Sequence, residues 1–217
     1  MNDLFEIAKK YNLDKLILHT YIAYYNKLFQ NFEVTNMLEI GIGLKSHEDE
    51  MKIITNNYIG GNSLLMWKDY FNQAIVHGID IYNTNRFDND DRIKTYICDQ
   101  SSKEQLNNLV KKTGDFDLII DDGSHKYSDQ KISLENLIYN VKPNGMYIIE
   151  DVFNKHLDKL VNLYEFDEDI KEYIINNFDI FIARDTLDMT LYRTHILPEN
   201  IRDQSLLIYK RKPMVGM

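Results

Sequence analysis

Short apolar runs alternate with amphipathic stretches along most of the 217 residues. The apolar runs have the length and β-branched content of buried strands. They are "NMLEIGIG", "AIVHGIDIY", "IKTYICD", "FDLIIDD" and "MYIIED". Apolar positions at helical spacing lie between them and predict helices over residues 63–73, 104–112 and 128–139, the first with Asn62 or Ser63 as its N-cap. Strands that alternate with helices predict a mainly parallel sheet covered on both faces.

Both ends of the chain depart from this alternation. Between residues 3 and 32 the apolar spacing predicts two helices with a break near Asn12. Near the other end, "FDIFIAR" and "QSLLIYKRK" predict a pair of antiparallel strands at the sheet edge. We therefore expect an α/β fold: a Rossmann-like, seven-stranded, mostly parallel sheet with an antiparallel C-terminal edge and helices on both faces. Residues 1–35 would form an N-terminal helical cap, and residues 36–217 one compact unit.

Charge and cysteine content narrow the range of partners. The formal net charge is -9 and the isoelectric point is near 5.1, without the basic face that binding to a nucleic-acid backbone requires. Cys98 is the single cysteine, so no intramolecular disulfide forms. We find no signal peptide and no apolar stretch long enough to span a bilayer. We expect a cytoplasmic protein with no membrane insertion and no nucleic-acid partner.

Acidic residues end five consecutive predicted strands. They are Glu39, Asp80, Asp99, Asp121 with Asp122, and Glu150 with Asp151. In a parallel sheet all these positions fall on one edge, and ligands bind outside the carboxyl ends of the strands. A single carboxylate of this kind can equally cap a helix. Five consecutive strand ends predict a binding site at this edge.

The first predicted strand ends in the glycine turn "EIGIG", where Gly41 and Gly43 allow the backbone to approach a ligand closely. The turn differs from a dinucleotide fingerprint because no third glycine follows at the expected spacing, and residues 44–59 are polar and irregular. Asp80 is the type of residue that binds both hydroxyls of a ribose. No lysine-containing phosphate cradle is present nearby. These features favour an adenosine ligand without phosphates, and S-adenosylmethionine is such a ligand.

Six segments carry a resemblance to a known family. They are "LEIGIG", "GGNSLLMWKDYF", "GIDIY", "DQSS", "FDLIIDDGSH" and "NGMYIIEDV". In this order they resemble the class I S-adenosylmethionine-dependent methyltransferases, and most closely the macrolide sugar O-methyltransferases of the mycinamicin and macrocin type. The early "KYNLDK" and "HTY" resemble a segment near the cofactor in these enzymes. The resemblance implies that residues 36–217 are the methyltransferase domain.

The resemblance also implies a metal site and a base. Asp122, Glu150 and Asp151 would be ligands of Mg²⁺, and the catalytic residues would be His125, as general base, and Asp122. Hard oxygen ligands suit Mg²⁺ better than zinc. A bound metal that lowers the pKa of a hydroxyl and a base that accepts its proton meet the main difficulty of methylating a sugar. The alternative for His125 is a cap on the helix that begins near Ser128.

A second group of residues is expected to bind S-adenosylmethionine. It comprises Glu39, Gly41, Gly43, Ser63, Asp80, Asp99, Gln100 and Asp121. Ser63 lies at a predicted helix start, where the helix dipole favours a carboxylate such as that of the methionine part. The resemblance implies that Asp99 and Gln100 contact the adenine side.

The predicted function is metal-dependent methyl transfer from S-adenosylmethionine to a hydroxyl of a sugar or sugar-containing small molecule, such as an antibiotic or surface-polysaccharide precursor. The alternatives are a metal-free N-methyltransferase acting on an amine and a non-catalytic S-adenosylmethionine-binding module. The complete acidic set and His125 argue against the module, because a protein that only binds the cofactor needs neither. The sequence leaves the identity of the acceptor open, and it leaves open whether the protein forms a homo-oligomer.

Overall fold

A computed structural model of the protein describes residues 3–11, 13–17, 19–44, 60–184 and 204–214. Seven strands form one sheet in the order β3-β2-β1-β4-β5-β7-β6. Their bounds are β1 Asn36–Ile40, β2 Ile75–Asp80, β3 Ile93–Ile97, β4 Phe116–Asp121, β5 Val141–Phe153, β6 Phe178–Arg184 and β7 Gln204–Arg211. Strands β1 to β5 pair in parallel, whereas β7 is antiparallel to both β5 and β6. The predicted mostly parallel sheet with an antiparallel edge is confirmed.

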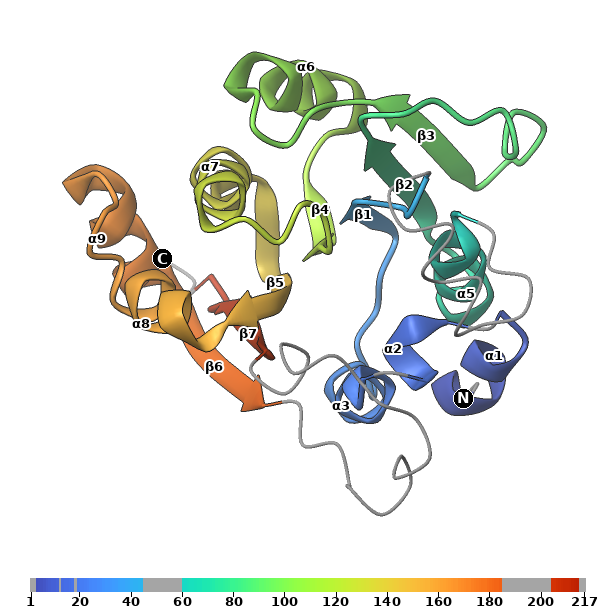
Figure 1. The fold of residues 1–217 in the computed structure, drawn as a ribbon, viewed down its shortest axis with the longest axis horizontal. Coiled ribbons are helices and arrows are strands. Elements are labelled where there is room, and N and C mark those ends of the chain that lie inside the picture. Colours follow the sequence, from blue (N-terminus) through green and yellow to red (C-terminus); the bar gives the residue numbers. More distant parts are fainter. Residues whose placement is uncertain (1–2, 12, 18, 45–59, 185–203, 215–217) are drawn as a thin grey trace.

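Helices cover both faces of this sheet (Figure 1). Helices α1, α3 and α5 lie on one side, and α6, α7, α8 and α9 lie on the other. The bounds of the helices are α1 Leu4–Lys9, α2 Asp14–Ile17, α3 Tyr21–Leu28, α5 Asn62–Tyr70, α6 Lys103–Thr113, α7 Tyr127–Leu137, the 3-10 turn Ile138–Asn140, α8 Asn154–Asn162 and α9 Glu168–Asn177. None of the described helices is long and apolar enough to cross a membrane.

The core has two halves separated by the sheet. On the side of α1, α3 and α5 it is built around stacked and edge-on aromatic rings that include Tyr25, Phe29 and Trp67. On the other side Leu134 and Leu160 pack against the apolar side chains of the central strands. Burial on both faces explains why these strands read as continuous apolar runs. It also leaves the ends of the strands as the places where polar groups reach solvent.

Local details differ from the expectation at three places. The N-terminal stretch forms three short helices, not two, and the expected break at Asn12 lies outside the described residues. Helix α5 begins at Asn62 with Gly61 as its N-cap, because that position has φ +83 and an added Cβ would meet the Phe87 ring at 2.7 Å. The segment "KPNG" at 142–145, whose proline and glycine predict a turn from the sequence, lies within β5, where the register to β4 shifts.

The strand order determines where a ligand can bind. The chain runs outward from β1 to β2 and β3 and then returns to add β4 on the other side of β1. Strand order therefore reverses between β1 and β4, and a crevice opens at the carboxyl ends of strands at such a point. Of the predicted irregular segment 44–59, residues 45–59 lie outside the described residues.

Candidate active site

A cavity of about 510 Å³ lies at the carboxyl ends of β1 to β4. It has the position expected for a ligand at the point where strand order reverses. Eight of the residues predicted from the sequence line it, namely Gly41, Gly43, Ser63, Asp80, Asp99, Gln100, Asp122 and His125. The structure thus brings most of the predicted site together around one cavity.

The glycine turn after β1 forms one wall of this cavity. Gly41 and Gly43 have φ values of +79 and +69, a region that favours glycine. A Cβ on Gly41 would lie 2.2 Å from the carbonyl oxygen of Asp122, so the two backbones touch. The carboxylate of Asp80 holds the turn in place by accepting hydrogen bonds from the backbone N–H groups of Ile42 at 3.2 Å and Leu44 at 3.3 Å.

The opposite wall follows β3. The carboxylate of Asp99 accepts hydrogen bonds from the backbone N–H and the hydroxyl of Ser101, at 2.8 and 2.7 Å. The Gln100 side chain accepts a hydrogen bond from the backbone N–H of Ser124 at 2.7 Å. Gln100 therefore links this wall to the loop that carries the predicted base, His125.

Asp121 lies behind the cavity and is not among its lining residues. Its carboxylate is fully buried and accepts hydrogen bonds from Gln100, Ser133 and Tyr147. Burial raises the pKa of Asp121 to about 6, although the hydrogen bonds from Ser133 and Gln100 lower it. In this structure the side chain that was predicted to bind the cofactor belongs to a buried network supporting the β4 end.

Glu39 is also fully buried and also lies outside the lining of the cavity. It accepts a hydrogen bond from the Ser63 hydroxyl at 2.7 Å, and the Lys15 ammonium lies 3.7 Å from its other oxygen. Burial raises the pKa of Glu39 to about 7, while Lys15 and Ser63 lower it. Glu39 thus acts on the cavity through Ser63 and Lys15, which do line it.

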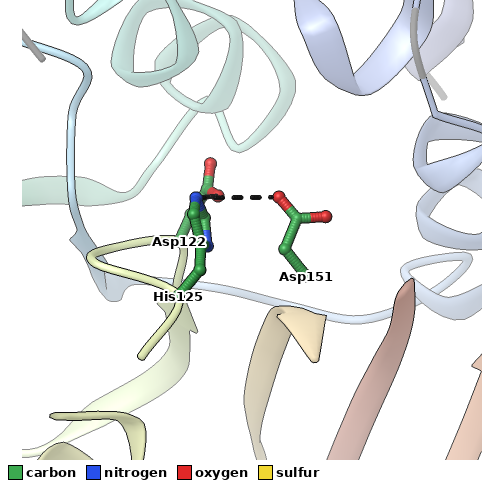
Figure 2. Close-up of side chains that lie close together, drawn as sticks. All are labelled: Asp122, His125 and Asp151. Carbon is green, nitrogen blue, oxygen red and sulfur yellow. Dashed lines mark ion pairs between the residues drawn. The ribbon is translucent and has the colours of Figure 1, made fainter. Parts of the chain in front are cut away.

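Asp122, His125 and Asp151 form a cluster beside the cavity (Figure 2). One potential ligand atom from each lies within 4.8 Å of the others. His125 Nε2 lies 4.0 Å from Asp122 Oδ1 and 3.8 Å from Asp151 Oδ2. His125 and Asp151 have φ values of +55 and +52, a conformation that is uncommon outside glycine although Asp and His adopt it more often than most residues, and that is often found at functional sites. The two carboxylates at these distances are suited to holding a divalent cation such as Mg²⁺, with the imidazole of His125 beside it.

Glu150, the third predicted metal ligand, has other partners. Its Oε2 accepts a hydrogen bond from Lys15 at 2.7 Å, and its Oε1 accepts one from the Tyr25 hydroxyl at 2.7 Å. Burial and the nearby Asp122 carboxylate raise the pKa of Glu150 well above its ordinary value, although Lys15 and Tyr25 lower it. Glu150 lies next to the cluster in sequence but is fixed by groups from the N-terminal helices.

The sequence interpretation did not predict the contacts that side chains of the N-terminal helices make with these acids. Lys15 is 2% exposed and donates to both Asp122 and Glu150. Tyr21 donates to Asp151 Oδ1 at 2.8 Å. The available signal was the resemblance of "KYNLDK" and "HTY" to a cofactor-proximal segment, but it did not indicate which acids these side chains would meet.

Comparison with known proteins points to one group of enzymes. No protein-family model matches the chain. The chain is 33% identical over 157 residues to mycinamicin VI 2''-O-methyltransferase of Micromonospora griseorubida, covering 71% of this chain and 37% of that protein. It is 34% identical over 157 residues to demethylmacrocin O-methyltransferase of Streptomyces fradiae, with the same coverage of 71% and 37%. The chain thus spans well under half the length of these relatives.

A solved structure shares the fold. The MycE methyltransferase from the mycinamycin biosynthetic pathway, in complex with Mg and SAH, superposes with a TM-score of 0.72 at 24% identity. The match covers 100% of this chain and 57% of that one. At this level of identity the likeness establishes the arrangement of strands and helices.

Proposed function

We propose that this chain, which belongs to the class I S-adenosylmethionine-dependent methyltransferases, transfers a methyl group to a sugar hydroxyl with the help of a divalent cation. The observation that supports this most strongly is the cluster of Asp122, His125 and Asp151. It lies beside a cavity at the point where the strand order of the sheet reverses. The two relatives are named as O-methyltransferases of mycinamicin VI and of demethylmacrocin. Because the chain covers 37% of their length, its activity is proposed from its own site.

The cavity walls fit the methyl donor. S-adenosylmethionine, when bound, supplies a methyl group on a positively charged sulfur. Gly41 and Gly43 offer backbone without a Cβ, and the Asp80 and Asp99 carboxylates face a ligand from two neighbouring strand ends. We infer that Asp80 binds the ribose hydroxyls, with Asp99 and Gln100 beside the adenine and Ser63 near the methionine carboxylate.

The acidic cluster fits a cation and a base. Oxygen ligands from Asp122 and Asp151 suit Mg²⁺, and Glu150 lies one residue from Asp151 as a third carboxylate. Mg²⁺, when bound, lowers the pKa of a hydroxyl near it. His125 takes the proton of the sugar hydroxyl at Nε2, the ring atom that faces both aspartates. The deprotonated oxygen takes the methyl group from the sulfur, and S-adenosylhomocysteine is left as the second product.

The test is a turnover assay of the 217-residue chain with S-adenosylmethionine and a panel of glycosides and nucleotide sugars. The panel includes antibiotic-type glycosides and polysaccharide precursors, since both carry free sugar hydroxyls. We expect S-adenosylhomocysteine to form with a sugar acceptor and EDTA to abolish its formation, with added Mg²⁺ restoring it. Full activity in EDTA would reject the metal mechanism and favour metal-free transfer, for instance to an amine.

A further inference from the structure

All three carboxylates predicted to hold the cation accept hydrogen bonds from the N-terminal helices. We call Asp122, Glu150 and Asp151 the rim carboxylates. Their partners are three side chains from α2 and α3, the donor residues Lys15, Tyr21 and Tyr25. The donor residues are separated from the rim carboxylates by about a hundred positions or more in the sequence. These contacts therefore depend on how the N-terminal helices pack against the sheet.

The donor residues are buried, and their burial is explained by these contacts. Lys15 is 2% exposed, and both tyrosines are 0% exposed. A lysine is almost never buried to this extent unless it is paired with acids. The aromatic bodies of Tyr21 and Tyr25 belong to the core on this side of the sheet, so their hydroxyls are held at fixed positions.

The hydrogen bonds divide the oxygens of the two aspartates into two sets. Lys15 donates to Asp122 Oδ2, and Tyr21 donates to Asp151 Oδ1. The opposite oxygens, Asp122 Oδ1 and Asp151 Oδ2, are the ones nearest to His125 Nε2. Lys15 and Tyr21 thus each hold one oxygen of an aspartate and leave the other oxygen directed toward His125.

We propose that Lys15, Tyr21 and Tyr25 are positioning residues that orient the rim carboxylates for the divalent cation. This inference rests on the proposed function, because it assumes a cation at the rim carboxylates. Residues that hydrogen-bond to metal ligands and orient them usually contribute about 10- to 100-fold to metal affinity. An effect of charge alone has the opposite sign, since removing an ammonium group near the site would tighten the binding of a cation. The direction of the change therefore distinguishes positioning from simple charge.

The experiment is an electron paramagnetic resonance titration with Mn²⁺ on the 217-residue chain. We expect Lys15→Met to weaken Mn²⁺ binding by about 10- to 100-fold. Tyr21→Phe and Tyr25→Phe, which remove one hydroxyl each and keep the ring, are each expected to weaken it by about three- to tenfold. The matched controls are Tyr11→Phe, which removes a 2.7 Å bond to Asp69, and Lys68→Met, which removes an ion pair with Asp90. Both controls lie outside the rim and should bind Mn²⁺ like the wild type.

Unchanged or tighter Mn²⁺ binding by folded Lys15→Met would overturn the inference. If circular dichroism shows that this variant does not fold, the two tyrosine variants decide, and unchanged binding in both would overturn it. Failure of Mn²⁺ to bind the wild-type chain is a separate outcome, which would remove the proposed cation site and this inference with it. Weaker binding in the variants, with both controls unaffected, would establish the positioning role.

Discussion

Gly41 connects the cofactor cavity to the cation cluster, and replacing it by alanine tests that connection. Its Cα lies against the peptide that joins Asp122 to Gly123. A Cβ at this position would lie 2.2 Å from the Asp122 carbonyl oxygen and 2.6 Å from the Gly123 Cα. Both are backbone atoms, so no side-chain rotation relieves the contact. Gly41→Ala must therefore move the end of β1 away from the end of β4.

The size of the effect follows from these distances. The two backbones must separate by about 0.8 Å to reach the 3.0 Å below which real Cβ contacts essentially never occur. The left-handed conformation costs alanine about 1–2 kcal/mol, and overpacking of this kind costs about 1–3 kcal/mol. Together they lower the free energy of unfolding by about 2–5 kcal/mol, or the Tm by about 4–20 °C for a chain of this size.

The assay combines thermal unfolding with calorimetric titration of S-adenosylhomocysteine. The control is Gly114→Ala, because Gly114 also has a positive φ of +73 but nothing lies within 4 Å of its Cβ position. We expect both variants to lose stability. Only Gly41→Ala should bind S-adenosylhomocysteine at least about tenfold more weakly, since a displacement near 1 Å disturbs a site of this kind by such factors.

Equal affinity of the two glycine variants for S-adenosylhomocysteine would refute this reasoning. It would mean that the turn after β1 tolerates displacement, and that close approach of its backbone to the ligand is not required. A loss of Mn²⁺ affinity in Gly41→Ala, with none in Gly114→Ala, would extend the connection from the cavity to Asp122.

Three further predictions use other parts of the site and fold. Asp80→Ala should weaken S-adenosylhomocysteine binding by about 1.5–3 kcal/mol, the range for a charge-assisted hydrogen bond, and calorimetry showing wild-type affinity in a folded variant would contradict the ribose role. His125→Ala should lower the turnover rate by about 10² to 10⁴ with S-adenosylhomocysteine affinity unchanged, whereas a loss of affinity without a loss of rate would exclude the role of base. Burial lowers the pKa of His77 to about 4, below its ordinary value of 6.5, so neutral His77 contributes stability above pH 6.5 that is lost as the pH falls through 4. Urea unfolding of His77→Phe should therefore show a flatter pH dependence between 4 and 6.5, and a slope equal to that of the wild type would contradict this assignment.

The sheet could be predicted because burial on both faces leaves a direct record in the sequence. Strands such as β4 are apolar over most of their length, and the helical spacing between them is distinct. The start of α5 could not be predicted in the same way. Gly61 takes the N-cap position because its backbone lies against the Phe87 ring, a contact that joins residues 26 positions apart. Such a choice depends on packing rather than on local preference.

The candidate site was predictable as far as topology alone determines it. Parallel strands bring their carboxyl ends to one edge, so the acids at those ends had to meet. Which acid faces the cavity depends on the alternation of side chains along a strand. Asp122 lines the cavity while its neighbour Asp121 is buried behind it, so the two adjacent acids face in different directions, as this alternation requires. Lys15 could not be placed, because its contacts arise only when the N-terminal helices pack against the sheet.

The acids at this edge of the sheet fall into a buried group and a partly exposed group, and the two groups have different roles. Glu39, Asp121 and Glu150 are at most 1% exposed, and burial raises the pKa of each. Each also accepts a hydrogen bond from a side chain of the protein, as buried carboxylates require. These hydrogen bonds hold the three carboxylates in place, and the carboxylates in turn orient Ser63, Gln100 and Lys15. The partly exposed acids Asp80, Asp99 and Asp122 line the cavity, and Asp151, which is also partly exposed, lies near Asp122. Lys15 contacts members of both groups. Its ammonium group, which comes from the N-terminal helices, therefore joins the buried Glu39 beside the cavity to Asp122 and Glu150, two of the acids that would hold the cation.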